Sequence, residues 1–195
     1  MRRFIAAFAV VIALFTSFSC AHSPEECDYV QVPAPKPIDT VKSYKIIIHK
    51  GVPADRVGLI LDAADEWVLA SSGAVVFEVT YGDFDFKALP ADGEMRIYTE
   101  PKADKSSNTI GLATTWGQDD KGHPVKSRIW LQDDLDRRTY FLTAMHEVGH
   151  AIGLPHFELK PPASIMYPYI TDVGDHPTCV DRQKLCQLWG CEPGC

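Results

Sequence analysis

The chain has 195 residues, of which 46% are hydrophobic and 23% are charged, proportions that are usual for a globular domain. Its formal net charge is −7, and it becomes −9 without the two arginines that follow Met1, because 17 basic residues then stand against 26 acidic ones. Nucleic-acid binding depends on basic surface, so this balance argues against a nucleic-acid partner. We expect one folded domain behind a short leader.

Residues 1–21 have the pattern of an export signal, because Arg2 and Arg3 precede twelve apolar residues, Phe4 to Phe15. That stretch is too short to span a bilayer as a helix. Ser19-Cys20-Ala21 offers an ordinary cleavage site, whereas Ser17 to Cys20 is similar to a bacterial lipobox and would end the signal at residue 19 with a lipid on Cys20. Both alternatives stay open. Either the protein is secreted, or it is a lipoprotein of a bacterial cell envelope that contacts the membrane only through this anchor.

A proline-rich linker is expected over residues 22–43, since residues 23–40 contain four prolines and no periodic pattern. The folded domain, residues 44–195, should begin with a strand from Tyr44 to His49, which is dense in β-branched residues. We interpret His49 as a strand-end residue and not as a metal ligand. Apolar residues at helical spacing then predict a long helix from Ala54 to Ala70.

Four more strands are predicted where β-branched and aromatic residues lie between Gly, Asp or Pro clusters. They are Val75 to Tyr81, Glu94 to Thr99, Gly111 to Thr115 and Ser127 to Gln132. Between the last two, Trp116 to Lys126 contains two glycines and a proline, which predicts a surface loop with a solvated His123.

A second helix should open at Asp136 or Thr139 and carry an apolar face. That face consists of Phe141, Leu142, Met145, Val148 and Ile152. A last helix is predicted from Asp181 to Trp189.

The second helix contains the most informative segment, HEVGHAIGLPH, at residues 146–156. His146 and His150 are four residues apart, so they share one face of a helix and can reach the same ion. Gly153 tolerates the left-handed conformation that stops the helix and returns the chain, so that His156 can supply a third ligand. Three imidazoles with a fourth position left for water are typical of a catalytic zinc site. Glu147 would act as the general base and acid beside the metal.

This segment resembles the metzincin signature HExxHxxGxxH, and Ser164 to Pro168, with Met166 at its centre, resembles the methionine turn of the same family. The ten-residue spacing from His156 to Met166, and Tyr167-Pro168 after it, are most similar to the matrixin branch. The resemblance implies that Met166 supports the metal site from below. It also implies no tyrosine ligand, because Pro168 occupies the place where some metzincins have one.

The matrixin resemblance also implies a substrate cleft. Ile110 to Ala113 is similar to the edge strand against which a substrate pairs, so Leu112 and Ala113 are candidate cleft residues. Pro168, Tyr169 and Ile170 would form one wall of a side-chain pocket. Of the ligands of a second, structural zinc, only His123 and Asp119-Asp120 have counterparts. We therefore expect one Zn²⁺, and calcium is left open.

Four of the six cysteines lie in the segment 179–195, and in an exported protein they predict two disulfides. These four are Cys179, Cys186, Cys191 and Cys195. All three pairings stay open, and the spacing lacks the paired gaps of a zinc ribbon. Cys27 could bond to Cys20, remain free, or occupy the zinc as a latency switch.

Together these features predict an α+β, zincin-like catalytic domain with a mixed, mostly parallel, twisted sheet, a long packing helix and an active-site helix. The resemblance implies a zinc endopeptidase with protein or peptide substrates, the N-terminal segment predicts export, and we expect a monomer. Two alternatives are a binding or adhesion module that keeps the zinc scaffold without cleaving, and an amidase that acts on cell-wall peptides.

Overall fold

Strands and helices follow one another in the order that the sequence predicts. The structure, a computed structural model, describes residues 41–101, 107–158, 164–169 and 174–191. Its elements are β1 (Lys42–His49), α1 (Ala54–Ala70), β2 (Val75–Gly82), β3 (Glu94–Glu100), β4 (Gly111–Gln118), β5 (Pro124–Gln132), α2 (Arg137–Ala151) and α3 (Cys179–Trp189). The export signal, Cys20, Cys27, Ile170 and Cys195 lie outside the described residues.

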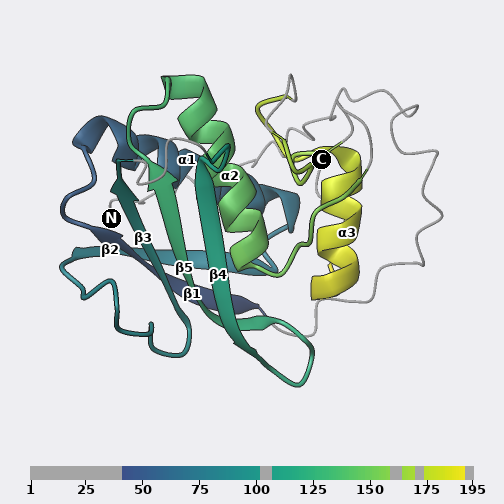
Figure 1. The fold of residues 1–195 in the computed structure, drawn as a ribbon. Coiled ribbons are helices and arrows are strands. Elements are labelled where there is room, and N and C mark those ends of the chain that lie inside the picture. Colours follow the sequence, from purple (N-terminus) through teal and green to yellow (C-terminus); the bar gives the residue numbers. More distant parts are fainter. Residues whose placement is uncertain (1–40, 102–106, 159–163, 170–173, 192–195) are drawn as a thin grey trace, which may run out of the picture.

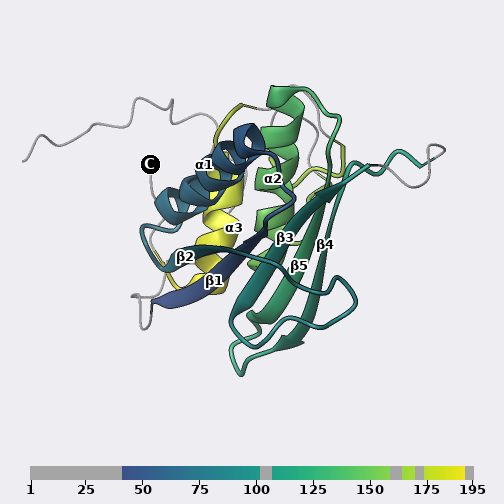
Figure 2. The ribbon, with the colours of Figure 1, turned by 90° about the vertical axis from the view of Figure 1, so that its left-hand side faces the viewer.

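The five strands form one twisted sheet in the order β2-β1-β3-β5-β4 (Figures 1 and 2). β1 pairs in parallel with β2 and β3, and β3 pairs in parallel with β5. Only β4 runs antiparallel, beside β5, and it forms one edge of the sheet. The predicted α+β class with a mixed, mostly parallel sheet is confirmed.

The three helices lie on one side of this sheet, with α3 next to α2 (Figures 1 and 2). In β1, β3 and β5, alternate residues are buried, which is the two-residue period of a sheet with one covered face. The largest of these buried side chains are Tyr44, Ile46, Ile48, Met95, Ile97, Ile129 and Leu131, and they pack with Ile60 and Trp67 of α1. None of the helices in the described ranges combines the length and apolar composition that a bilayer crossing requires.

Most of the segment from Trp116 to Lys126 belongs to strands and not to the surface loop that we predicted. β4 continues to Gln118 and β5 starts at Pro124, so residues 119–123 alone form the turn of a hairpin. His123 is not solvated but 5% exposed. The two strands are longer than predicted because their backbones pair up to the turn: Trp116 pairs with Lys126, and Gln118 pairs with Pro124. The glycines and the proline of this segment are compatible with that register.

The C-terminal helix begins two residues earlier than predicted. Thr178 is its N-cap and forms a capping box with Asp181. A disulfide joins Cys186 to Cys191, which confirms one bridge within the predicted cysteine cluster, and Cys179 is disulfide-bonded as well.

Candidate active site

The second helix, α2, carries two of the three predicted ligands. Asp136 caps it, because its carboxylate accepts the backbone N–H of Thr139 at 3.0 Å. The helix ends at Ala151, and Gly153 follows with φ of +103°, a left-handed conformation that favours glycine. A Cβ atom there would also lie 2.8 Å from Leu188 Cδ2. The chain therefore turns back at Gly153 in close contact with α3.

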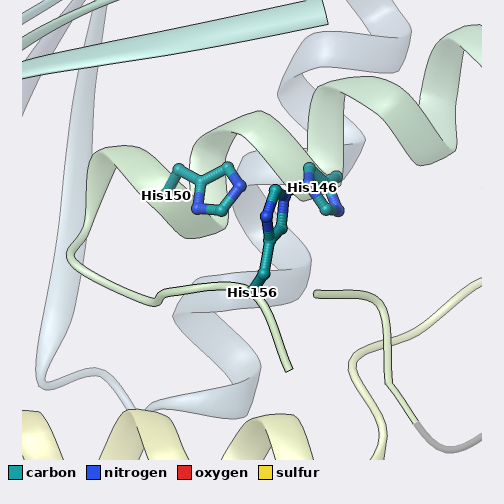
Figure 3. Close-up of side chains that lie close together, drawn as sticks. All are labelled: His146, His150 and His156. Atoms are coloured by element: carbon teal, nitrogen blue, oxygen red, sulfur yellow. Dashed lines mark hydrogen bonds between the residues drawn. The ribbon is translucent and has the colours of Figure 1, made fainter. Parts of the chain in front are cut away.

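This turn brings His146, His150 and His156 together. Figure 3 shows the three rings pointing toward one another, two from α2 and one from the segment after the turn. Their ligand nitrogens all lie within 4.8 Å of one another, and the Nε2 atoms of His146 and His156 are 3.1 Å apart. Two nitrogens bound tetrahedrally to one zinc at about 2.0–2.1 Å would be separated by roughly 3.3 Å. The spacing fits a single metal ion.

Backbone carbonyls orient two of these rings. His146 Nδ1 donates to the carbonyl of Ile165 at 2.7 Å, and His150 Nδ1 donates to the carbonyl of Leu154 at 2.7 Å. An imidazole that uses Nδ1–H in this way presents the lone pair of Nε2 to the site, which is the usual arrangement of a histidine ligand. The donor set therefore suits zinc.

Burial favours the neutral, metal-binding form of the histidines in α2. Desolvation, with the neighbouring rings of His150 and His156, lowers the pKa of His146 to about 4. Desolvation also lowers the pKa of His150. Neutral imidazole is the form that can bind a metal ion at neutral pH.

Glu147 is 6% exposed and lies beside the histidines in the same cleft. Burial raises the pKa of its carboxyl group to about 7, although a hydrogen bond from the backbone of Ala113 in β4 acts in the opposite direction. The candidate base is thus in direct contact with the edge strand of the sheet.

Met166 packs against α2 and is fully buried. A Cβ atom on Gly149 would lie only 2.5 Å from its Sδ atom, so a glycine in the metal helix permits this close approach. The Met166 carbonyl accepts the N–H of Phe157, which directly follows His156 in the chain, at 3.0 Å. The methionine segment therefore contacts the ligand segments through both its side chain and its backbone.

The cleft around these groups has a volume of about 990 Å³. Of the predicted cleft residues, Leu112 and Ala113 line one wall, and Pro168 and Tyr169 line another. Leu112 and Tyr169 are exposed large apolar side chains, at 55% and 67%.

Sequence reasoning missed the role of Asp181 of α3. This fully buried carboxylate accepts the hydroxyl of Ser164 and the N–H of Ile165 at 2.8 Å, so it fixes the residue whose carbonyl orients His146. It also accepts the N–H of Thr178 at 2.8 Å. The pattern Thr178-x-x-Asp181 is a capping signal that was present in the sequence.

Gly111 was predicted as the start of a strand and as part of the segment that resembles the cleft edge, but not as a neighbour of Glu147. A Cβ atom there would lie 2.5 Å from Thr143 Cγ2 and 2.9 Å from Glu147 Cγ. No sequence pattern pairs a strand residue with a helix residue more than thirty positions later.

Comparison with known proteins found one matching family and similarities to two proteins. The family model described as Matrixin matches residues 35–190. Matrilysin of Rattus norvegicus is 36% identical over 75 residues, a match that covers 37% of this chain and 27% of matrilysin, so only about a quarter of that relative is represented. The crystal structure of an archaemetzincin from Methanopyrus kandleri aligns with a TM-score of 0.49 and 15% identity, over 77% of this chain and 96% of the other.

Proposed function

This chain belongs to the matrixin family of metzincin metallopeptidases, and from that premise we propose that it is a zinc-dependent endopeptidase acting on proteins or peptides. One observation carries the proposal: the converging nitrogens of His146, His150 and His156 lie in the same cleft as the carboxylate of Glu147. Three ligands of one type with a carboxylate beside them correspond to a catalytic zinc, which keeps a position open.

The three histidines would hold the zinc ion. When bound, zinc supplies Lewis-acid activation of a water molecule and of the scissile carbonyl. Glu147 would accept a proton from the attacking water and pass it to the leaving amine. The N–H of Ala113 holds the carboxylate toward the cleft during this transfer.

Strand β4 would bind the substrate. It is an edge strand, and its residues Gly111, Leu112 and Ala113 line the cleft. An extended peptide that pairs with this edge uses backbone hydrogen bonds for affinity. The exposed side chains of Leu112 and Tyr169 are available to contact alternate side chains of that peptide.

Cleavage of a peptide library, read by mass spectrometry with and without a chelator, tests this function. We expect cleavage that the chelator abolishes and that zinc restores. Glu147→Gln should lower kcat by at least about a thousandfold while zinc stays bound. Glu78→Gln, on the exposed side of β2, is the matched control and should leave cleavage unchanged. Zinc-loaded protein that cleaves no peptide, or cleavage by Glu147→Gln at the wild-type rate, would contradict the proposal.

We also propose export. The charged and apolar regions of residues 1–21 support it, and so does the Cys186–Cys191 disulfide, a bond typical of oxidising compartments. Mass spectrometry of the mature protein from cell fractions tests the proposal, because a lipidated Cys20, a soluble cleaved chain and an uncleaved cytoplasmic chain have different masses. The uncleaved chain would contradict export. The same sample in light scattering tests the expected monomer.

A further inference from the structure

His123, in the turn between β4 and β5, occupies an unusual place for a turn residue. Its ring stacks on the indole of Trp189, the last residue of α3, with centroids 3.8 Å apart and planes 6° from parallel. Its Nε2 atom is 3.1 Å from the carbonyl of Leu188, and its Nδ1 atom is 3.2 Å from Asp119 Oδ2. Both partners are acceptors, so the ring satisfies them both when it carries a proton on each nitrogen.

Asp119 is itself held in place. Lys42 of β1 donates to its carboxylate at 2.7 Å, and the N–H groups of Lys121 and His123 donate to it at 3.0 and 2.9 Å. The Lys42 ammonium also lies 5.9 Å from the centroid of the Trp189 ring. His123 therefore joins the hairpin turn, the start of β1 and the end of α3.

Trp189 links His123 to α2. Its indole N–H donates to the carbonyl of Ile152 at 3.1 Å, and Ile152 is the C-cap of α2. The next residue, Gly153, is packed between Leu188 of α3 and Pro124 of the hairpin, whose atoms lie 2.8 and 3.1 Å from its Cβ position. The turn that leaves α2 is thus enclosed by the hairpin and α3, two of the elements that His123 joins.

That turn determines the position of two metal ligands. The carbonyl of Leu154 orients His150, and the chain leaving the turn places His156 beside His146. Neither ring contacts His123 directly in the hydrogen bonds and ring contacts of the described residues.

We propose that His123 is a positioning residue of the metal site: with Trp189 it fixes the turn after α2 and so sets His156 at the distance that one metal ion requires. This inference rests on the proposed zinc site. The β4–β5 hairpin would thus affect the metal site indirectly. The His123 side chain packs against α3, whereas its neighbours Gly122 and Pro124 line the cleft.

Zinc affinity, measured by competition with a chromophoric chelator, tests the proposal without using activity. His123→Phe keeps an aromatic ring for stacking but loses both hydrogen bonds. We expect it to bind zinc about tenfold more weakly than the wild type, the scale of changes in groups that orient ligands. His49→Phe is the matched control, since His49 also contacts aromatic rings, Phe84 and Phe86, but at the far end of β1. It should change zinc affinity by no more than about twofold.

Repeating the measurement in a His156→Ala background separates positioning from general loss of stability. If His123 acts mainly through His156, His123→Phe should lower the residual zinc affinity there by only about two- to threefold, because His150 alone still depends on the turn. An equal loss in both backgrounds, or no loss in either, would overturn the proposal. Trp189→Phe, which removes the hydrogen bond to Ile152, should reproduce the loss and serves if His123→Phe does not fold. A wild-type protein that binds no zinc would instead refute the proposed function itself.

Discussion

Gly111 lies directly against Glu147: a methyl group on Gly111 would be 2.9 Å from both Cγ and Oε1 of the glutamate. The candidate base is therefore confined between its own helix and Gly111, the first residue of edge strand β4. The N–H of Ala113, two residues along the same strand, donates to the Glu147 carboxylate. Strand β4 thus both shapes the cleft and holds the carboxylate.

Gly111→Ala should impair catalysis more than zinc binding. The added methyl group forces Glu147 or Thr143 to move, and overpacking of this kind costs about 1–3 kcal/mol. We expect kcat for peptide cleavage to fall by at least about tenfold, because small displacements of a catalytic group have large effects on rate. Gly58→Ala in α1 is the control: no atom lies within 4 Å of its Cβ position, so it should retain activity and gain up to about 1 kcal/mol of stability. Unchanged kcat in Gly111→Ala would contradict this view of Glu147.

Asp181→Asn should weaken both the fold and the metal site. The amide places an NH₂ group in a site where the carboxylate accepts four hydrogen bonds. Buried hydrogen bonds to a charged group contribute about 1.5–3 kcal/mol. We expect a loss of that size in the free energy of unfolding, measured with urea. Zinc affinity should fall as well, because Ile165 orients His146. Asp65→Asn on the exposed side of α1 should change neither quantity.

Asp119 should contribute stability that depends on pH. Burial acts to raise the pKa of its carboxyl, but hydrogen bonds from Lys42, His123 and Lys121 outweigh burial and hold the pKa below the ordinary value of 3.8. A carboxyl group whose pKa is lowered by folding stabilises the protein above its unfolded pKa, and this contribution is lost as the pH falls toward the folded pKa. The stability difference between the wild type and Asp119→Asn should therefore be present at about pH 7 and shrink at about pH 2–3. A difference that is equal at both values would refute the assignment.

Zinc should stabilise the folded chain. A ligand that binds only the native state at about a thousand times its Kd adds about 4 kcal/mol to the free energy of unfolding. We expect a chelator to lower Tm and zinc to restore it. His156→Ala should lose most of this response, because it removes one of the three converging nitrogens. His49→Ala, a histidine outside that group, should keep the full response.

Much of the fold follows from local patterns in the sequence. The helix predicted from Ala54 to Ala70 has those bounds in the structure, because its apolar residues recur at helical spacing and a proline and serines flank it. The strands differ from prediction by a few residues at their ends. The convergence of the three histidines was predicted correctly because the i,i+4 pair and the glycine that ends the helix are local features. His156 follows Gly153 by three residues, so it must lie near the end of that helix.

The surroundings of the site were harder to predict. His123 was expected in solvent because its neighbours in sequence are glycine, proline and charged residues, yet its partner Trp189 lies 66 residues later. Gly111 of β4 lies against Glu147 of α2, and Asp181 of α3 binds the backbone of Ile165 in the methionine segment. These contacts depend on how elements pack, and a pattern within one element does not contain that information.

The involvement of α3 has a consequence for how the protein matures. Asp181 and Trp189 hold the methionine segment and the end of α2, so the geometry of the histidine motif depends on a helix that follows it in the chain. Without α3, the segment whose carbonyl orients His146 and the turn after α2 each lose a hydrogen-bond partner. We therefore expect tight zinc binding to require that α3 has docked, which couples metal affinity to the folding of a helix that supplies no ligand.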